Sequence, residues 1–114
     1  MKEIKIDVSG MAMGRAASEV AKLILDKNNP SFASNVVTDN FVIIENLEKL
    51  AVNPRKMSNL THYTHSGHLG NLKSTSYKDM FESDPKGLFL LVLKRMLPDN
   101  RLRVKRMKRI RFAK

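Results

Sequence analysis

The first quarter of the chain combines a strand pattern, a glycine turn and a helix pattern in a fixed order. Apolar and polar residues alternate from Ile4 to Val8, as they do in a β-strand, and Gly10 ends the alternation. Apolar residues then recur at helical spacing and predict a helix that ends near Asp26; they occupy positions 13, 16, 17, 20, 21 and 24. Strand, turn and helix form the first half of a β-α-β crossover, so we expect a parallel sheet.

The turn after this strand lacks the glycines of a dinucleotide-binding site. Such a site needs glycine at three set positions, whereas Ala12 and Arg15 follow Gly10 where the other glycines are expected. The residues of this turn therefore exclude a nicotinamide dinucleotide site. Arg15 falls in the first turn of the predicted helix, where a cation opposes the helix dipole. We interpret it as a contact for an external anion, with a surface arginine lying over the sheet as the alternative.

A second strand is predicted in the middle of the chain. The run from Phe41 to Glu45 is continuous and β-branched, which is typical of a parallel strand covered on both faces. Asn53 and Pro54 end the short element that follows. Arg55 and Lys56 are therefore expected on an exposed loop, where they are candidates for an anion contact.

Helix caps mark the C-terminal half of the chain. The stretch Ser76–Asp79 resembles a capping box and predicts a short helix through Phe81. Asp84–Pro85 has the residue types of an N-cap and a first helical position, which predicts a longer helix that Pro98 ends. Ile110–Phe112 alternates like a final strand.

The segment Thr61–Lys73 differs in composition from the rest of the chain. It holds all three histidines, two of the five glycines and one of the two tyrosines. Its polar side chains need partners once they leave water, so the segment suits a surface better than a core. Rings, hydroxyls and closely approachable glycine backbone favour RNA as its partner. An edge strand over Thr61–Thr64 with a turn over Ser66–Asn71 is the alternative interpretation.

Two kinds of chemistry are poorly supported by this segment. Its histidines recur every third residue, but a closed zinc site needs four ligands and the chain has no cysteine and no other histidine. An enzyme that used His65 as a general base with Asp79 or Ser66 would need a pocket and a positioned partner, and no triad spacing or phosphate loop supports one. We expect no metal, no cofactor, no small-molecule substrate and no catalysis.

Positive charge is concentrated at the C-terminal end. The net charge is +10, and residues 94–114 carry ten Lys and Arg against Asp99 alone, whereas residues 1–93 are nearly neutral. Such a concentration repels itself unless a polyanion neutralises it, so nucleic acid is the partner that we expect. A solvated basic face, a membrane-surface helix and a DNA-binding module are the alternatives.

Length and composition favour one domain over residues 1–114. A chain of 114 residues with 42% apolar residues builds a modest core. The longest apolar run, Leu88–Leu93, is too short to span a bilayer, and Met1 is followed by charged residues rather than by a signal peptide. We therefore expect an intracellular protein without a membrane partner.

Five motifs together match the order of a known family. Ile6–Gly10 and Met13–Ser18 read as a strand and a helix that contains Gly-Arg, and Phe41–Asn46 reads as a second strand. In His62–Lys73, an aromatic residue and His-Ser-Gly precede a glycine and Leu-Lys, and Lys94–Pro98 ends in Met-Leu-Pro. In these motifs the chain resembles the bacterial-type large-subunit ribosomal protein L-thirteen family over nearly its whole length.

This resemblance implies both a fold and a function. The fold is α/β, a three-layer α/β/α arrangement with a small, mostly parallel sheet of four strands in the order 3-2-1-4, in which Ile110–Phe112 lies beside the first strand. The function is that of a structural constituent of the large ribosomal subunit, which binds large-subunit rRNA directly and early in assembly, beside neighbouring ribosomal proteins. The expected location is the cytoplasmic ribosome rather than an organellar one. Another basic module, for DNA or non-ribosomal RNA, is the alternative.

The chain departs from the family pattern at a few positions. Asn71 and Arg95 stand where the family has glycine, and Asn53–Pro54 replaces its usual Thr-Gly. We also expect the chain to be shorter than the family at both ends. The charge at Arg95 is expected to strengthen a phosphate contact.

The candidate RNA-binding residues fall into two groups. Cations neutralise phosphates, so that released counterions supply most of the affinity; this group is Arg15, Arg55, Lys56, Lys73, Lys94, Arg95, Arg101, Arg103, Lys105, Arg106 and Lys108. Rings, hydroxyls and bare backbone supply stacking, 2′-hydroxyl contacts and close approach; this group is His62, Tyr63, His65, Ser66, Gly67, His68 and Gly70. Some arginines of the C-terminal end are expected to be solvated, with Ile110 and Phe112 buried.

Overall fold

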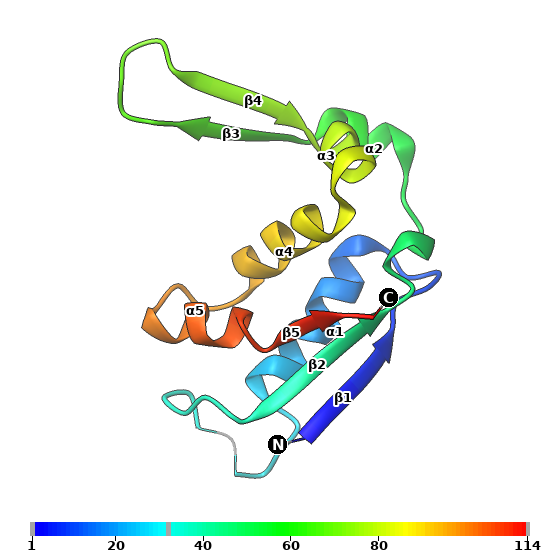
Figure 1. Cartoon of the computed structure of the whole chain (residues 1–114), viewed down its shortest axis with the longest axis vertical. Coiled ribbons are helices and arrows are strands. Elements are labelled where there is room, and N and C mark those ends of the chain that lie inside the picture. The colour runs from blue at the N-terminus through cyan, green and yellow to red at the C-terminus, as the bar shows by residue number, and fades with distance from the viewer. Residues whose placement is uncertain (1, 32, 114) are drawn as a thin grey trace.

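The described chain begins with the order β1-α1-β2 and ends with three successive helices and a final strand (Figure 1). The computed structural model describes residues 2–31 and 33–113, so Met1, Phe32 and Lys114 lie outside the described residues. The described strands are β1 (Lys2–Asp7), β2 (Asn40–Glu45), β3 (Thr61–His65), β4 (Leu72–Ser76) and β5 (Ile110–Phe112). The described helices are α1 (Met13–Leu25), the 3-10 turn η1 (Leu47–Lys49), α2 (Pro54–Asn59), α3 (Tyr77–Ser83), α4 (Pro85–Met96) and α5 (Arg101–Met107).

Three parallel strands form the larger sheet, in the order β1-β2-β5. Ile44 of β2 lies opposite Ile6 of β1 and Phe112 of β5. The parallel sheet and the final strand are confirmed, but the predicted four-stranded order 3-2-1-4 is wrong for the described residues, because β5 lies beside β2 and not beside β1. The reason lies in α4, whose Phe89 meets the Phe112 ring edge-on at 6.3 Å and so draws β5 to the free edge of β2.

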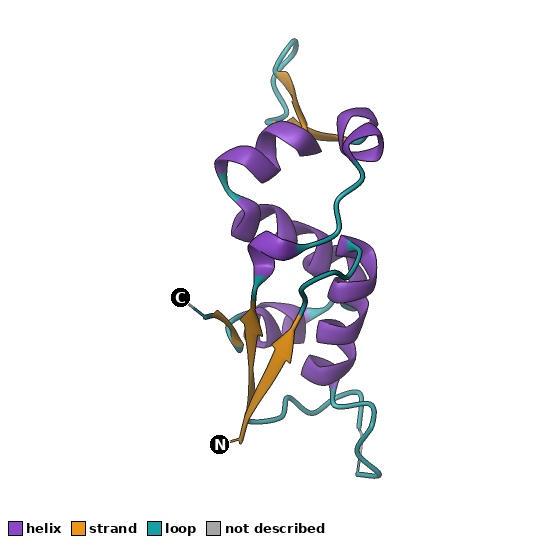
Figure 2. Cartoon of the chain, turned by 90° about the vertical axis from the view of Figure 1, so that its right-hand side faces the viewer, coloured by secondary structure: helices purple, strands orange, loops and turns teal. Residues whose placement is uncertain are grey.

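The two faces of this sheet are covered differently. Val42 and Ile44 are buried in the core shared with α1 and α4, whereas Phe41, which points the other way, is half-buried. Figure 2 shows α1 beside one face of the sheet. On the other face the guanidinium carbons of Arg109 and Arg111 lie 5.0 and 4.3 Å from the centre of the Phe41 ring. The expected cover on both faces is therefore wrong here, since arginine side chains cover Phe41 in place of a second helical layer.

The main core lies between the sheet, α1 and α4. The predicted apolar face of α1 is confirmed, with Ala16, Ala17 and Val20 all fully buried. The two alanines are small enough to let the helix approach its neighbours closely, and Phe89 and Leu93 of α4 fill the remaining volume. Helix α4 thereby joins the sheet-bound core to the smaller cluster under α2 and α3.

Caps decide where the shorter helices begin. Ser76 Oγ accepts the Asp79 N–H at 3.3 Å and Asp84 Oδ1 accepts the Gly87 N–H at 3.1 Å, which confirms the predicted starts of α3 and α4. The loop expected after Pro54 is wrong. Asn53 instead accepts the Arg55 N–H at 3.1 Å and Pro54 takes the first helical position, so this pair begins α2.

Among the described residues, every helix is too short or too polar to traverse a bilayer.

Candidate nucleic-acid interface

Strands β3 and β4 form an antiparallel hairpin that projects from α2 and α3 (Figure 1). Its register runs from Thr61 opposite Ser76 at the base to His65 opposite Leu72 at the tip. The strand and turn of the alternative interpretation are both present, and β4 is an addition that the sequence did not predict. The hairpin carries much exposed apolar surface, since Tyr63 and Leu72 on its strands and Leu69 in its turn are all exposed. A surface of this kind on a projecting element favours contact with another molecule.

The turn over residues 66–71 has a defined shape. His65 Nδ1 accepts the Gly67 N–H at 2.9 Å, and the Asn71 amide donates to Ser66 Oγ at 3.2 Å. Gly67 and Gly70 have φ angles of 93° and 79°, a left-handed backbone conformation that residues other than glycine rarely adopt. The predicted glycine positions are therefore needed for the course of the backbone, and the His65 ring supports the turn with one nitrogen.

The predicted stacking residues lie on opposite faces of the hairpin. Because side chains alternate along a strand, Tyr63 and His65 share one face with Leu72, which pairs with His65. His62 lies on the other face, where Lys73 pairs with Thr64. The hairpin thus has an exposed aromatic face and a face that carries a cation. His68, Ser66 and both glycines of the turn are exposed between them.

Arg95 lies at the base of the hairpin. Its Nη1 donates to the Tyr77 hydroxyl at 2.8 Å, and its Nη2 lies 3.0 Å from His62 Nδ1. The Tyr77 N–H also donates to the Leu60 carbonyl at 3.0 Å, which closes the base of the hairpin. The structure therefore joins Arg95 to its own hairpin, a contact that charge alone did not predict.

The cations of the C-terminal end have different environments. Among the described residues, the cations of this end that are exposed are Lys94, Arg95, Arg101, Lys105, Lys108 and Arg111. Arg103 is half-buried and pairs with Asp99 at 3.0 Å. Arg106 is only 2% exposed and donates to the Ser34 carbonyl at 3.1 Å. Its burial conflicts with the predicted phosphate contact, since the guanidinium already binds the Ser34 carbonyl and exposes almost no surface.

Arg109 and Arg111 are two further cations of this end that were not among the predicted residues. Both lie over Phe41, and Arg109 also pairs with Asp39 at 3.1 Å. The alternation in Ile110–Phe112 could have indicated the position of Arg111, because the middle residue of a strand points to the opposite face from its two apolar neighbours.

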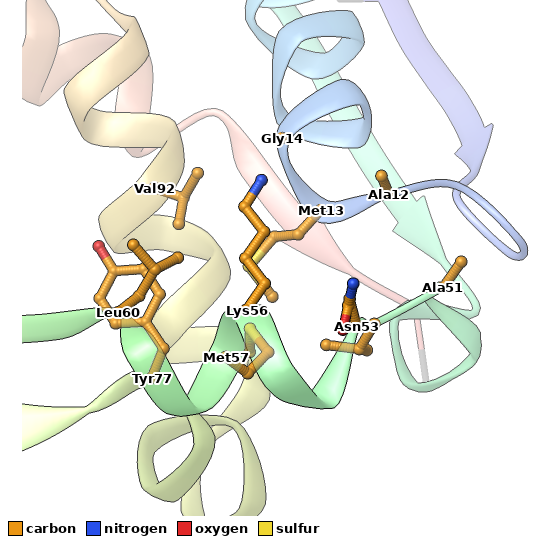
Figure 3. Close-up of a pocket in the computed structure, with 11 residues that line it drawn as sticks. Ala12, Met13, Gly14, Ala51, Asn53, Lys56, Met57, Leu60, Tyr77 and Val92 are labelled. Atoms are coloured by element: carbon orange, nitrogen blue, oxygen red, sulfur yellow. The ribbon is translucent and has the colours of Figure 1, made fainter.

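The remaining predicted cations lie away from the hairpin tip. Arg15 is exposed in the first turn of α1, and Arg55 and Lys56 are exposed on α2. Figure 3 shows Lys56 extending toward Met13, across a mostly apolar hollow of about 210 Å³ between α1 and α2. Lys56 is the only charged residue among those that line the hollow, and none of them is a histidine or a carboxylate. The hollow therefore offers neither an imidazole nor a carboxylate as a general base.

The hairpin and α5 lie on the same side of the molecule. Figure 1 shows the hairpin and α5 both extending to the left, with α4 between them. Lys94 belongs to the last turn of α4 and so lies between the two regions. Across residues 2–31 and 33–113, no three His, Asp or Glu side chains gather as they would around a metal ion.

The pKa of the Asp7 carboxyl is lowered at the end of β1. The Ser9 backbone N–H donates to its Oδ1 at 2.9 Å, the Asn46 amide donates at 3.0 Å, and the charge of Lys49 adds a smaller effect. These donors hold the turn after β1 against the turn after β2. The group lies in the sheet region and so serves the fold rather than the hairpin.

Comparison with known proteins identifies the family. The family model described as "Ribosomal protein L13" matches residues 1–113. The large ribosomal subunit protein uL13 of Thermotoga petrophila is 38% identical over 106 residues, which cover 93% of this chain and 71% of the relative. The uL13 proteins of Kocuria rhizophila and Citrifermentans bemidjiense are 40% and 36% identical, over 93% and 94% of this chain and 72% and 75% of the relatives. The chain therefore belongs to the ribosomal protein L13 family.

Proposed function

We propose that this protein, a structural constituent of the large ribosomal subunit and not an enzyme, binds large-subunit rRNA directly and early in assembly. The chain would do so as one domain, on the cytoplasmic ribosome and beside neighbouring ribosomal proteins. The observation that carries the proposal is the projecting hairpin, which has a shaped turn, an aromatic face and a cationic face on the side of the molecule that carries α5.

Exposed cations would supply most of the affinity. Lys73 on the hairpin, Lys94 on α4, Arg101 and Lys105 on α5 and Lys108 after it are all exposed. If these side chains neutralise phosphates, the logarithm of the binding constant should fall with the logarithm of salt concentration at a slope of about −4. Arg106 is left out of this set because it is buried.

The hairpin would select folded RNA over other polyanions. The exposed rings of Tyr63 and His65 offer stacking platforms for unpaired bases. Gly67 and Gly70 bring bare backbone to the tip, where the N–H and C=O groups can approach a 2′-hydroxyl. Duplex DNA presents neither unpaired bases nor 2′-hydroxyls, so it should compete poorly.

The test is a binding series with fluorescently labelled fragments of large-subunit rRNA at several salt concentrations. The expected result is a steep salt slope and weak competition by random RNA, duplex DNA and anionic vesicles. Equal competition by duplex DNA would favour the alternative of a general basic module. A slope near zero would remove the electrostatic basis of the proposal.

Two variants separate affinity from selectivity. Replacing Arg101, Lys105 and Lys108 by glutamate should weaken binding to every polyanion by a similar factor. Replacing Tyr63 and His65 by alanine should weaken binding to the rRNA fragment more than binding to random RNA. Early binding is tested with rRNA free of other proteins; a requirement for earlier-bound ribosomal proteins would contradict that part of the proposal.

A further inference from the structure

One side chain connects three elements that are distant in the sequence. Arg95 of α4 donates to Tyr77 at the start of α3, 18 residues away, and approaches His62 of β3, 33 residues away. The two distances are 2.8 and 3.0 Å, both within hydrogen-bonding range. His62 is the second residue of β3 and Tyr77 directly follows β4, so these contacts lie at the base of the hairpin.

We propose that Arg95 is a positioning residue that fixes the direction of the β3–β4 hairpin relative to α4, and that it is not a phosphate contact. The inference rests on the proposed function, because the hairpin direction matters only if the hairpin binds RNA. It replaces the role that charge alone suggested for this residue.

The guanidinium is well suited to this role. It is planar, always charged and carries its N–H donors at fixed angles, so two acceptors bound to it are held in one relative orientation. Because arginine has no acceptor, His62 Nδ1 must accept the hydrogen bond, which requires that this nitrogen carry no proton. One acceptor belongs to the hairpin and the other to α3, so the single side chain ties both to α4.

The hairpin needs such a connection. An isolated two-stranded hairpin is marginally stable in water, and most residues of β3 and β4 are exposed. Its base is closed by the bond from the Tyr77 N–H to the Leu60 carbonyl. That bond joins the hairpin to α3 but leaves α4 out, so Arg95 supplies the link to the longer helix.

Tyr77 gives the contact a second purpose. Its side chain is buried, with 8% of the residue exposed, and a buried hydroxyl without a partner destabilises the fold. Arg95 satisfies that hydroxyl. The contact therefore lies beside the apolar cluster under α2 and α3, in which Tyr77 packs with Met57 and Leu88.

The first experiment measures the hairpin direction without RNA. The chain has no cysteine, so spin labels can be attached to Leu69→Cys at the tip and Glu48→Cys on the exposed 3-10 turn. The distance distribution between the labels should be narrow in otherwise unchanged protein. It should broaden in Arg95→Ala and also in Arg95→Lys, because lysine keeps the charge but lacks the planar fork.

Two further variants show whether a broader distribution reflects the lost contact or general misfolding. Tyr77→Phe keeps the buried ring and removes only the hydroxyl, so it should broaden the distribution by an intermediate amount. Lys94→Ala removes one charge from the adjacent position of the same helix and should leave the distribution unchanged. An unchanged distribution in both Arg95 variants would overturn the proposal.

The second experiment distinguishes positioning from phosphate binding. Arg95→Ala and Arg95→Lys should both bind the rRNA fragment about tenfold more weakly, with the salt slope of the unchanged protein. Lys94→Ala should instead reduce the slope by about 1. Full recovery of affinity by lysine, or a slope reduced by about 1 in Arg95→Ala, would identify a phosphate contact and overturn the proposal. If the unchanged protein binds no rRNA, the proposed function fails, while the label distances still decide the role of Arg95.

Discussion

The sheet-and-helix body and the β3–β4 hairpin keep their shapes by different means. In the body, which comprises β1, α1, β2, α4 and β5, the residues that fix the structure are apolar and buried, such as Val42 and Phe89. In the hairpin they are glycines in a left-handed conformation and polar groups such as His65, which form few but directed hydrogen bonds, and Arg95 reaches the base of the hairpin from α4. The body should therefore be sensitive to lost volume, and the hairpin to lost geometry.

This difference assigns the two regions separate tasks. The body supplies the free energy of folding, because burial of apolar surface is the dominant favourable term. The hairpin contributes little burial and exposes rings, backbone and a lysine instead. Changes in the body should appear first as lost stability, whereas changes in the hairpin should appear first as lost RNA binding.

The largest expected effect is in the body. Phe89→Ala removes a fully buried ring that meets Phe112 edge-on, so it should lower the free energy of unfolding by about 3–5 kcal/mol. Chemical denaturation followed by circular dichroism measures this loss. Leu69→Ala, at the fully exposed hairpin tip, is the control and should leave the stability nearly unchanged. Similar losses in both variants would contradict the division between the regions.

Alanine substitutions at two glycines, one in the hairpin and one in α1, should have smaller effects on stability. An alanine at Gly67 would meet no atom within 4 Å, so Gly67→Ala should cost only the left-handed conformation, about 1–2 kcal/mol within the turn. Binding to the rRNA fragment should weaken by about tenfold. Gly14→Ala, also in open space but inside α1, should instead stabilise the protein by about 0.5–1 kcal/mol. Fluorescence anisotropy and denaturation together separate the two results, and unchanged RNA binding by Gly67→Ala would argue against a role for the turn.

The short helix α2 lies between the two regions and should respond weakly. Asn53→Ala removes the side chain that accepts the Arg55 N–H and should cost about 1 kcal/mol of stability. Asn59→Ala removes the same amide from the last residue of this helix, where it is not an N-cap, and should cost less. Denaturation midpoints measure both variants. Equal losses would mean that α2 does not depend on its cap.

Several helices could be predicted from the sequence because their signals are local. The apolar spacing of α1 and the caps at Ser76 and Asp84 act within one or two helical turns, and all three are confirmed. The same logic failed for α2, where Asn53 and Pro54 ended an element in the prediction but begin a helix in the structure. Asn and Pro are equally suited to ending one element and to beginning a helix, so the surrounding packing decides which of the two occurs.

The pairing of strands and the hydrogen-bond partners of the arginines could not be predicted, because both depend on contacts between residues that are distant in the sequence. The alternation in Ile110–Phe112 fits either edge of the sheet, and Phe89, about twenty residues earlier, decides for β2. Strand β4 was not predicted, since its only apolar residue is Leu72. Likewise, charge placed Arg95 and Arg106 in one class, although Arg95 bonds at the base of the hairpin and Arg106 is buried and bonds to the Ser34 carbonyl.

The smallest expected effect depends on pH and belongs to the body. Because the Ser9 N–H, the Asn46 amide and Lys49 lower the pKa of Asp7, its carboxylate stabilises the folded state at any pH above the ordinary pKa of an aspartate. That contribution is lost as the pH falls through the lowered folded pKa, where the carboxyl takes up a proton in both states. Asp7→Ala should therefore be less stable than the unchanged protein at neutral pH, and the difference should disappear in strong acid.

Denaturation at a series of pH values measures this difference, which should be small because Asp7 is exposed. Asn46→Gly is the matched variant, since glycine accepts the φ of 58° at that position while the amide donor is lost. It should show a weaker form of the same pH dependence, because the Ser9 N–H remains. RNA binding by the hairpin should be unchanged in both variants at neutral pH. A parallel loss of RNA binding would show that the end of β1 is coupled to the hairpin, and the separation of the two regions would then have to be abandoned.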